Sequence, residues 1–144
     1  MSATVKFLIG LAAVLLMGWI YHGPLGNGEA LIDSLEGQAK VAVERSEVPG
    51  IGVRLSRQPL ARVATLSGPA NQFQREGQGS LKGLNDVVGE IEGVSSVDWA
   101  DTPEARSRVM PLLAETLGFL ALAYLAGVVL GRLLFGRRKH EGYL

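Results

Sequence analysis

The side chains that could carry out chemistry are few in this chain, and they lie far apart. Its two histidines, His22 and His140, stand near opposite ends of the 144 residues, so we do not expect them to share a metal ion. None of the serines has a histidine nearby on a common face, which argues against a serine triad. The sequence contains no cysteine, which excludes thiolate catalysis and disulfides. We therefore expect no catalytic residue, no metal site, no cofactor and no enzymatic activity.

Two small groups of charged residues could bind a ligand. Arg54, Arg57 and Arg62 cluster near an expected strand turn and could contact anionic lipid headgroups, although a solvated sheet edge is an equally good interpretation. Asp98 and Asp101 could bind a cation, but carboxylates at strand ends are usually just solvated. The formal net charge is +0, so we expect no nucleic-acid partner.

The elements that must position these residues include two uncharged apolar runs, residues 7–21 and 116–131. Runs of this kind predict two transmembrane helices, placed at residues 1–22 and 102–136, the second with a short turn before the membrane. A cleaved signal peptide is the alternative for the first run. Bulky residues such as Trp19 stand where small cleavage-site residues would be expected, so an uncleaved anchor is favoured.

Charged and aromatic residues mark the predicted membrane boundaries. Glu115 and Arg132 lie about 26 Å apart along a helix, so each can reach an opposite interface. Alternatively, Glu115 pairs with a cation of a neighbouring subunit. The predicted boundary residues are Lys6, Trp19, Tyr21, Glu115, Arg132, Arg137, Arg138 and Lys139.

The distribution of positive charge predicts the orientation. Lys6 precedes the first run, and a basic tail at residues 137–144 follows the second. By the positive-inside rule, both termini are expected in the cytoplasm and the central region in the periplasm of a bacterial inner-membrane protein.

Small residues predict where the helices pack. Ala123, Gly127 and Gly131 recur every four residues and form a smooth stripe that another helix backbone could approach closely. Gly10 and Gly18 on the first helix could line a matching groove. Packing within the hairpin, packing on a foreign helix and the absence of any specific partner all remain open.

Between the apolar runs, the sequence predicts a flexible linker at residues 23–29 and a small α+β domain at residues 30–101. Hydrophobic periodicity favours an α-β-β-α-β order, with both helices on one face of a three-stranded sheet and Trp99 in the core or an interface. Gly77 and Gly79 blur the start of the second helix, so residues 72–78 are loop or a separate turn. The expected elements are a helix from residue 30 to Pro49-Gly50, strands at 51–56 and 61–66, a helix at 80–92 and a strand at 95–100.

Two local signatures strengthen this interpretation. The segment Arg62-Val-Ala-Thr-Leu-Ser-Gly68 resembles a strand that ends in a Leu-Ser-Gly turn, and Glu92-Gly-Val-Ser-Ser-Val97 resembles a Gly-Val-x-x-Val entry into a last strand. With the element order, they resemble the BON domain of bacterial envelope proteins. The resemblance implies a non-enzymatic domain that binds phospholipid surfaces or other envelope proteins, and it implies no catalytic residue.

We expect a non-enzymatic accessory subunit whose helices dock on a larger membrane complex, photosynthetic or respiratory for example. Its BON-like αββαβ domain, flanked by the N- and C-terminal transmembrane helices, would brace that complex from outside the cytoplasm. The expected partners are therefore the membrane and other membrane-protein subunits. The alternative is an autonomous envelope-maintenance protein whose domain binds phospholipid.

Overall fold

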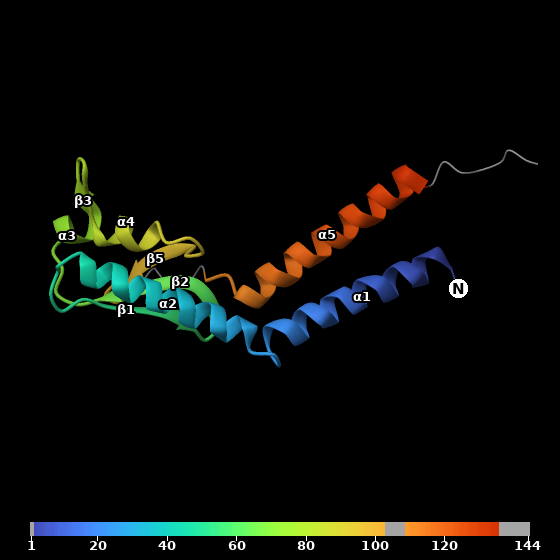
Figure 1. The fold of residues 1–144 in the computed structure, drawn as a ribbon, viewed down its shortest axis with the longest axis horizontal. Helices are drawn as coiled ribbons and strands as arrows, with labels where there is room; N and C mark the ends of the chain where they lie inside the picture. Colours follow the sequence, from blue (N-terminus) through green and yellow to red (C-terminus); the bar gives the residue numbers. More distant parts are fainter. Residues whose placement is uncertain (1, 103–108, 136–144) are drawn as a thin grey trace, which may run out of the picture.

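Two long helices extend side by side from a small domain that mixes helices and strands (Figure 1). The computed structural model describes residues 2–102 and 109–135. The long helices are α1, Ala3–His22, and α5, Leu112–Phe135. This arrangement confirms the predicted α+β class with an apolar helix near each end, and it places the domain at one end of an antiparallel helix pair.

The two long helices have the dimensions of membrane spans. With 20 and 24 residues, they measure about 30 and 36 Å, against a hydrocarbon core of about 30 Å. Only 6% and 0% of their most apolar stretches is buried within the molecule, unlike the core helix of a soluble protein. Both helices are therefore long and apolar enough to cross a membrane, and their apolar surface is available to lipid.

The connection between α1 and the domain is shorter than predicted. Helix α2, Asn27–Arg45, begins three residues before the expected start, so only a few residues of the predicted linker at 23–29 separate the helices. Gly26, with φ of 71°, makes the turn, and the Asn27 side-chain amide donates to the Tyr21 carbonyl at 3.1 Å. A compact elbow thus replaces the flexible exit that we expected from this glycine-rich segment.

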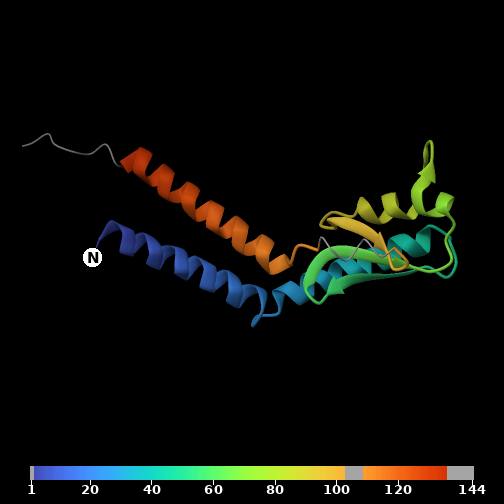
Figure 2. The ribbon, with the colours of Figure 1, turned by 180° about the vertical axis from the view of Figure 1, so that it is seen from behind.

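The three predicted strands are present and form one sheet. Strand β1, Gly52–Arg57, pairs antiparallel with β2, Leu60–Ser67, and β5, Ser96–Trp99, lies parallel to β2. The strand order is β1-β2-β5, which leaves one edge of β1 unpaired within this sheet. Figure 2 shows the sheet in front of α2, with α4 along its upper side.

The domain core lies between the sheet and two helices, as the hydrophobic periodicity predicted. Its apolar residues come from one stripe of α2, from alternating positions of the strands and from α4. Trp99 is only 6% exposed, which confirms its predicted place in the core. The core comprises Ile32, Leu35, Ala39, Val43, Val53, Leu55, Ala64, Leu66, Leu84, Val88, Trp99 and Leu112.

The segment between β2 and β5 differs from the single predicted helix at residues 80–92. It contains the short helix α3, Gln72–Glu76, a hairpin of β3 and β4, and a second short helix, α4, Leu84–Gly89. The hairpin strands are Gly77–Gln78 and Leu81–Lys82. A Cβ on Gly83 would lie 2.5 Å from the Arg75 carbonyl oxygen, so glycine permits a close backbone approach that the helical pattern does not reveal.

Helix α5 begins immediately after Pro111, whose carbonyl accepts a hydrogen bond from the Glu115 N–H at 3.1 Å. In the described part of the chain, the helix predicted at residues 102–136 therefore begins at Leu112. Residues 103–108 of that predicted range lie outside the described residues. The first residue of α5, Leu112, is 6% exposed and belongs to the domain core, so the domain extends into this helix.

Candidate interaction surfaces of the helix pair and the domain

The interface between α1 and α5 is built from glycines facing large side chains. A Cβ on Gly10 would overlap the Tyr124 ring, and one on Gly18 would overlap Leu120. The Tyr124 hydroxyl donates to the Phe7 carbonyl at 2.9 Å, and the two rings are 5.4 Å apart. Gly10 and Gly18 therefore pack within the hairpin, as one of our alternatives held, but against Tyr124 and Leu120 rather than against the small stripe of α5.

The small stripe of α5 does not take part in this interface. Ala123 and Gly127 are exposed, and a Cβ added to Gly127 or Gly131 would meet no described atom within 4 Å. Large apolar side chains beside the stripe are exposed as well, including Phe119 and Leu130. The stripe thus remains a smooth surface on the outside of the helix pair.

We call the contact between the domain and the start of α5 the junction, formed by Arg62, Gly93, Leu112 and Glu115. The Arg62 Nε lies 2.8 Å from a Glu115 carboxylate oxygen, and Arg62 Nη1 donates to the Gly93 carbonyl at 3.0 Å. The Arg62 and Glu115 side chains are only 29% and 15% exposed. Glu115 therefore has a cationic partner within the same chain, Arg62, which was not predicted from the sequence.

The elbow between α1 and α2 is also closely packed. Gly28 is buried, and the His22 ring lies so close that a Cβ on Gly28 would be 2.6 Å from its Cε1 atom. His22 thus has a packing role at the domain end of α1. His140 lies outside the described residues, as do Arg137, Arg138 and Lys139.

The three arginines predicted to contact headgroups have different surroundings. Arg57 binds Asp33 at 2.8 Å and Glu36 at 3.2 Å, while Arg62 belongs to the junction. Arg54 forms no ion pair with any residue in the described ranges. Arg54 is therefore the member of the trio whose charge is not engaged in this part of the chain.

Glu36 organises a charged network at the open edge of β1. Its carboxylate accepts from Lys40 Nζ at 2.7 Å and from the Leu55 N–H at 3.2 Å, in addition to Arg57. The hydrogen bond from Lys40 holds the pKa of Glu36 below its usual value against the opposing effect of burial, with help from the Leu55 N–H and Arg57. Sequence reasoning missed this residue, although an acid four positions after Ile32 on an apolar stripe was the available signal.

A second network covers the far end of the core. The Arg75 guanidinium lies 4.0 Å from the centre of the Trp99 ring and binds Asp101 through two hydrogen bonds of 3.0 and 2.7 Å. The hydrogen bond from Arg75 lowers the pKa of Asp101. Asp101 is thus engaged by an arginine, and the described residues contain no group of three acids or histidines that could hold a metal ion.

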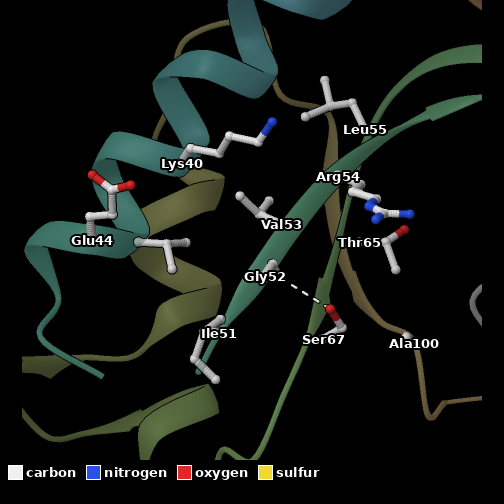
Figure 3. Close-up of a pocket in the computed structure, with 11 residues that line it drawn as sticks. Lys40, Glu44, Ile51, Gly52, Val53, Arg54, Leu55, Thr65, Ser67 and Ala100 are labelled. Atoms are coloured by element: carbon white, nitrogen blue, oxygen red, sulfur yellow. Dashed lines mark hydrogen bonds between the residues drawn. The ribbon is translucent and has the colours of Figure 1, made fainter. Parts of the chain in front are cut away.

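A pocket of about 690 Å³ lies along the open edge of β1 (Figure 3). Lys40 and Glu44 of α2 approach it from one side, and Arg54, Thr65 and Ser67 of the strands line the other. The Ser67 hydroxyl donates to the Gly52 carbonyl at 3.5 Å, and no histidine is among the lining residues in the described part of the chain. Among the described residues that line the pocket, Ser67 thus has no histidine beside it that could act as a base.

No protein-family model matches this chain, and no curated protein or solved structure matches it either. The function is therefore inferred from the chain's own geometry.

Proposed function

We propose that this chain is a non-enzymatic membrane subunit that docks on a larger membrane-protein complex through the small stripe of α5. The observation that carries the proposal is the division of glycines between the helices. Gly10 and Gly18 are used inside the hairpin, whereas Ala123 and Gly127 face outward. Close backbone approach is the usual basis of helix association in lipid, so the outward stripe suits a helix of another subunit.

The rigid attachment of the domain supports a bracing role. The elbow at His22 and Gly28 and the junction at Arg62 and Glu115 join the domain to both helices. A domain held at two points transmits force to the helices, whereas a domain on flexible linkers does not. We propose that the domain is BON-like and that it contacts the partner complex on the periplasmic side of a bacterial inner membrane, with both termini in the cytoplasm.

The test is extraction from the cell's own membranes with a mild detergent, followed by size analysis of the species that contains the chain. We expect a large species that contains other proteins. Gly127→Leu should release the chain from it, because the added side chain blocks close helix approach. Gly118→Leu is the matched control, since it lies nine residues earlier, about 180° around the helix, and its Cβ would also meet no described atom within 4 Å.

Two results would refute the proposal. One is migration of the wild-type chain as a single 15.3 kDa protein or as an assembly of identical chains. The other is equal release by Gly118→Leu and Gly127→Leu, which would show a general effect of bulk on α5.

A second candidate function is phospholipid binding by the domain, for which Arg54 at the edge pocket is the supporting observation. It predicts that Arg54→Gln weakens binding of the full chain to anionic phospholipid. An isolated domain ending at Asp101 would be a poor reagent for this test, because Leu112 belongs to the core.

A further inference from the structure

At the end of the helix pair farthest from the domain, α1 and α5 border a groove of about 490 Å³. Lys6 and Phe7 of α1 line one side, and Tyr124, Val128 and Arg132 of α5 line the other. The surrounding faces of both helices expose large apolar side chains. A ligand in this groove would therefore be continuous with the surrounding lipid.

The inner end of the groove is apolar, and the Tyr124 hydroxyl there already has a hydrogen-bond partner. Phe7 and Tyr124 pack with their rings tilted by 47°, and the Tyr124 hydroxyl donates to the Phe7 carbonyl. A ligand gains no hydrogen bond by displacing this pair. The rings and Val128 thus offer a surface for a hydrocarbon chain.

The rim of the groove carries positive charge. Lys6 and Arg132 line it from opposite helices, and no acidic residue is among its lining residues in the part of the chain that the structure describes. Both cations lie toward the domain-distal ends of the long apolar helices, the depth at which lipid phosphates sit when such helices span a bilayer.

We propose that this groove is a binding site for one anionic phospholipid. The phosphate binds between Lys6 and Arg132, and an acyl chain lies along Phe7, Val128 and Tyr124. The class of ligand follows from the two cations at the rim and the apolar side chains beneath them. A free anion would leave the floor unused, and an uncharged helix of a partner protein would leave two cations uncompensated at the rim.

The experiment is native mass spectrometry of the full chain in mild detergent, with phosphatidylglycerol or phosphatidylcholine of identical acyl chains. We expect the wild type to retain phosphatidylglycerol preferentially. The double variant Lys6→Gln/Arg132→Gln should lower that retention by about 25-fold, since each cation contributes about fivefold near a lipid phosphate. The matched control is Arg45→Gln/Lys82→Gln, which removes two exposed cations from the domain and should leave retention unchanged.

A second pair of variants separates a seated lipid from general charge attraction. Val128→Trp fills the groove and keeps both cations, so it should also lower phosphatidylglycerol retention. Phe119→Trp adds bulk at a side chain that is 70% exposed and should have no effect. Circular dichroism of each variant verifies that helicity is retained.

Four outcomes would overturn the proposal. The first is unchanged retention in the Lys6→Gln/Arg132→Gln variant, and the second is an equal loss in the domain control, which would show general attraction between cations and the lipid. The third is displacement of the lipid by millimolar inorganic phosphate, which would identify a site for a free anion. Unchanged retention in Val128→Trp would likewise exclude a lipid seated in the groove.

Discussion

The two ends of the helix pair differ in what closes them. At the domain end, Leu112, the Arg62–Glu115 pair and the His22–Gly28 contact fill the space between helices and domain with side chains of the chain itself. At the far end, the helices leave a groove lined by Lys6 and Arg132. The same hairpin is therefore closed by its own side chains where it meets the domain, whereas its far end leaves an open groove.

The largest effect is expected from truncating Leu112, the side chain that closes the domain end. Leu112→Ala should lower the free energy of unfolding of the domain by about 3 kcal/mol, because it leaves a cavity in the core. The measurement is urea unfolding in mild detergent, followed by Trp99 fluorescence in a Trp19→Phe background. Leu133→Ala, near the far end and 66% exposed, should change it by less than about 0.5 kcal/mol. Equal effects at both positions would show that the two ends of the helix pair do not differ in packing.

The junction's ion pair provides the next largest effect. A double-mutant cycle with Arg62→Met and Glu115→Gln should give a coupling energy of about 1.5 kcal/mol, because both side chains are largely shielded from water. The control cycle uses Lys82 and Glu90, whose 2.6 Å pair is exposed and should couple by less than about 0.5 kcal/mol. A junction coupling no larger than the control would mean that the pair does not hold the domain to α5.

The middle of the helix pair should respond more weakly. Tyr124→Phe removes the hydroxyl that donates to the Phe7 carbonyl and should destabilise helix pairing by about 0.6 kcal/mol. Because the chain lacks cysteine, spin labels on cysteines introduced at Ser2 and Phe135 report helix separation on heating. Tyr21→Phe, at an exposed position, should leave the melting profile unchanged.

The smallest expected effect is a loss of domain stability at low pH. The pKa of Glu36 is lowered in the folded chain, so its stabilisation is fully present above the ordinary value of 4.5 and is lost as the pH falls through the lower folded-state value. Acidification from pH 7 to pH 3 should therefore shift the urea midpoint of the wild type more than that of Glu36→Gln. Glu44→Gln, an exposed acid on the same helix, should retain the wild-type shift. An identical shift in all three proteins would show that Glu36 does not cause the loss of stability in acid.

Local patterns allowed much of the domain to be predicted. The helical spacing of Leu31, Leu35 and Ala39 and the alternation around Val53 depend only on near neighbours, and they correctly indicated α2 and β1. The buried stripe itself runs through Ile32 rather than through Leu31, which is exposed. The hairpin at residues 77–82 was missed, because short glycine-bounded strands produce almost no periodicity.

The candidate sites were less predictable than the elements. Arg62 and Glu115 are separated by 53 residues, and no local pattern pairs them. Gly10 was recognised as a packing position, but its partner Tyr124 depends on how two helices rotate against each other.

Composition and short-range periodicity were sufficient to predict the two apolar helices, the three strands of the larger sheet and the absence of cysteine chemistry. Which cations form ion pairs could be determined only from the tertiary structure. It directs Arg57 to Asp33 and Arg62 to Glu115, and it places Lys6 and Arg132 on the rim of one groove. The physical reason is that an ion pair or a lipid site requires proximity within a few ångströms, and residues distant in sequence acquire that proximity only when the chain folds.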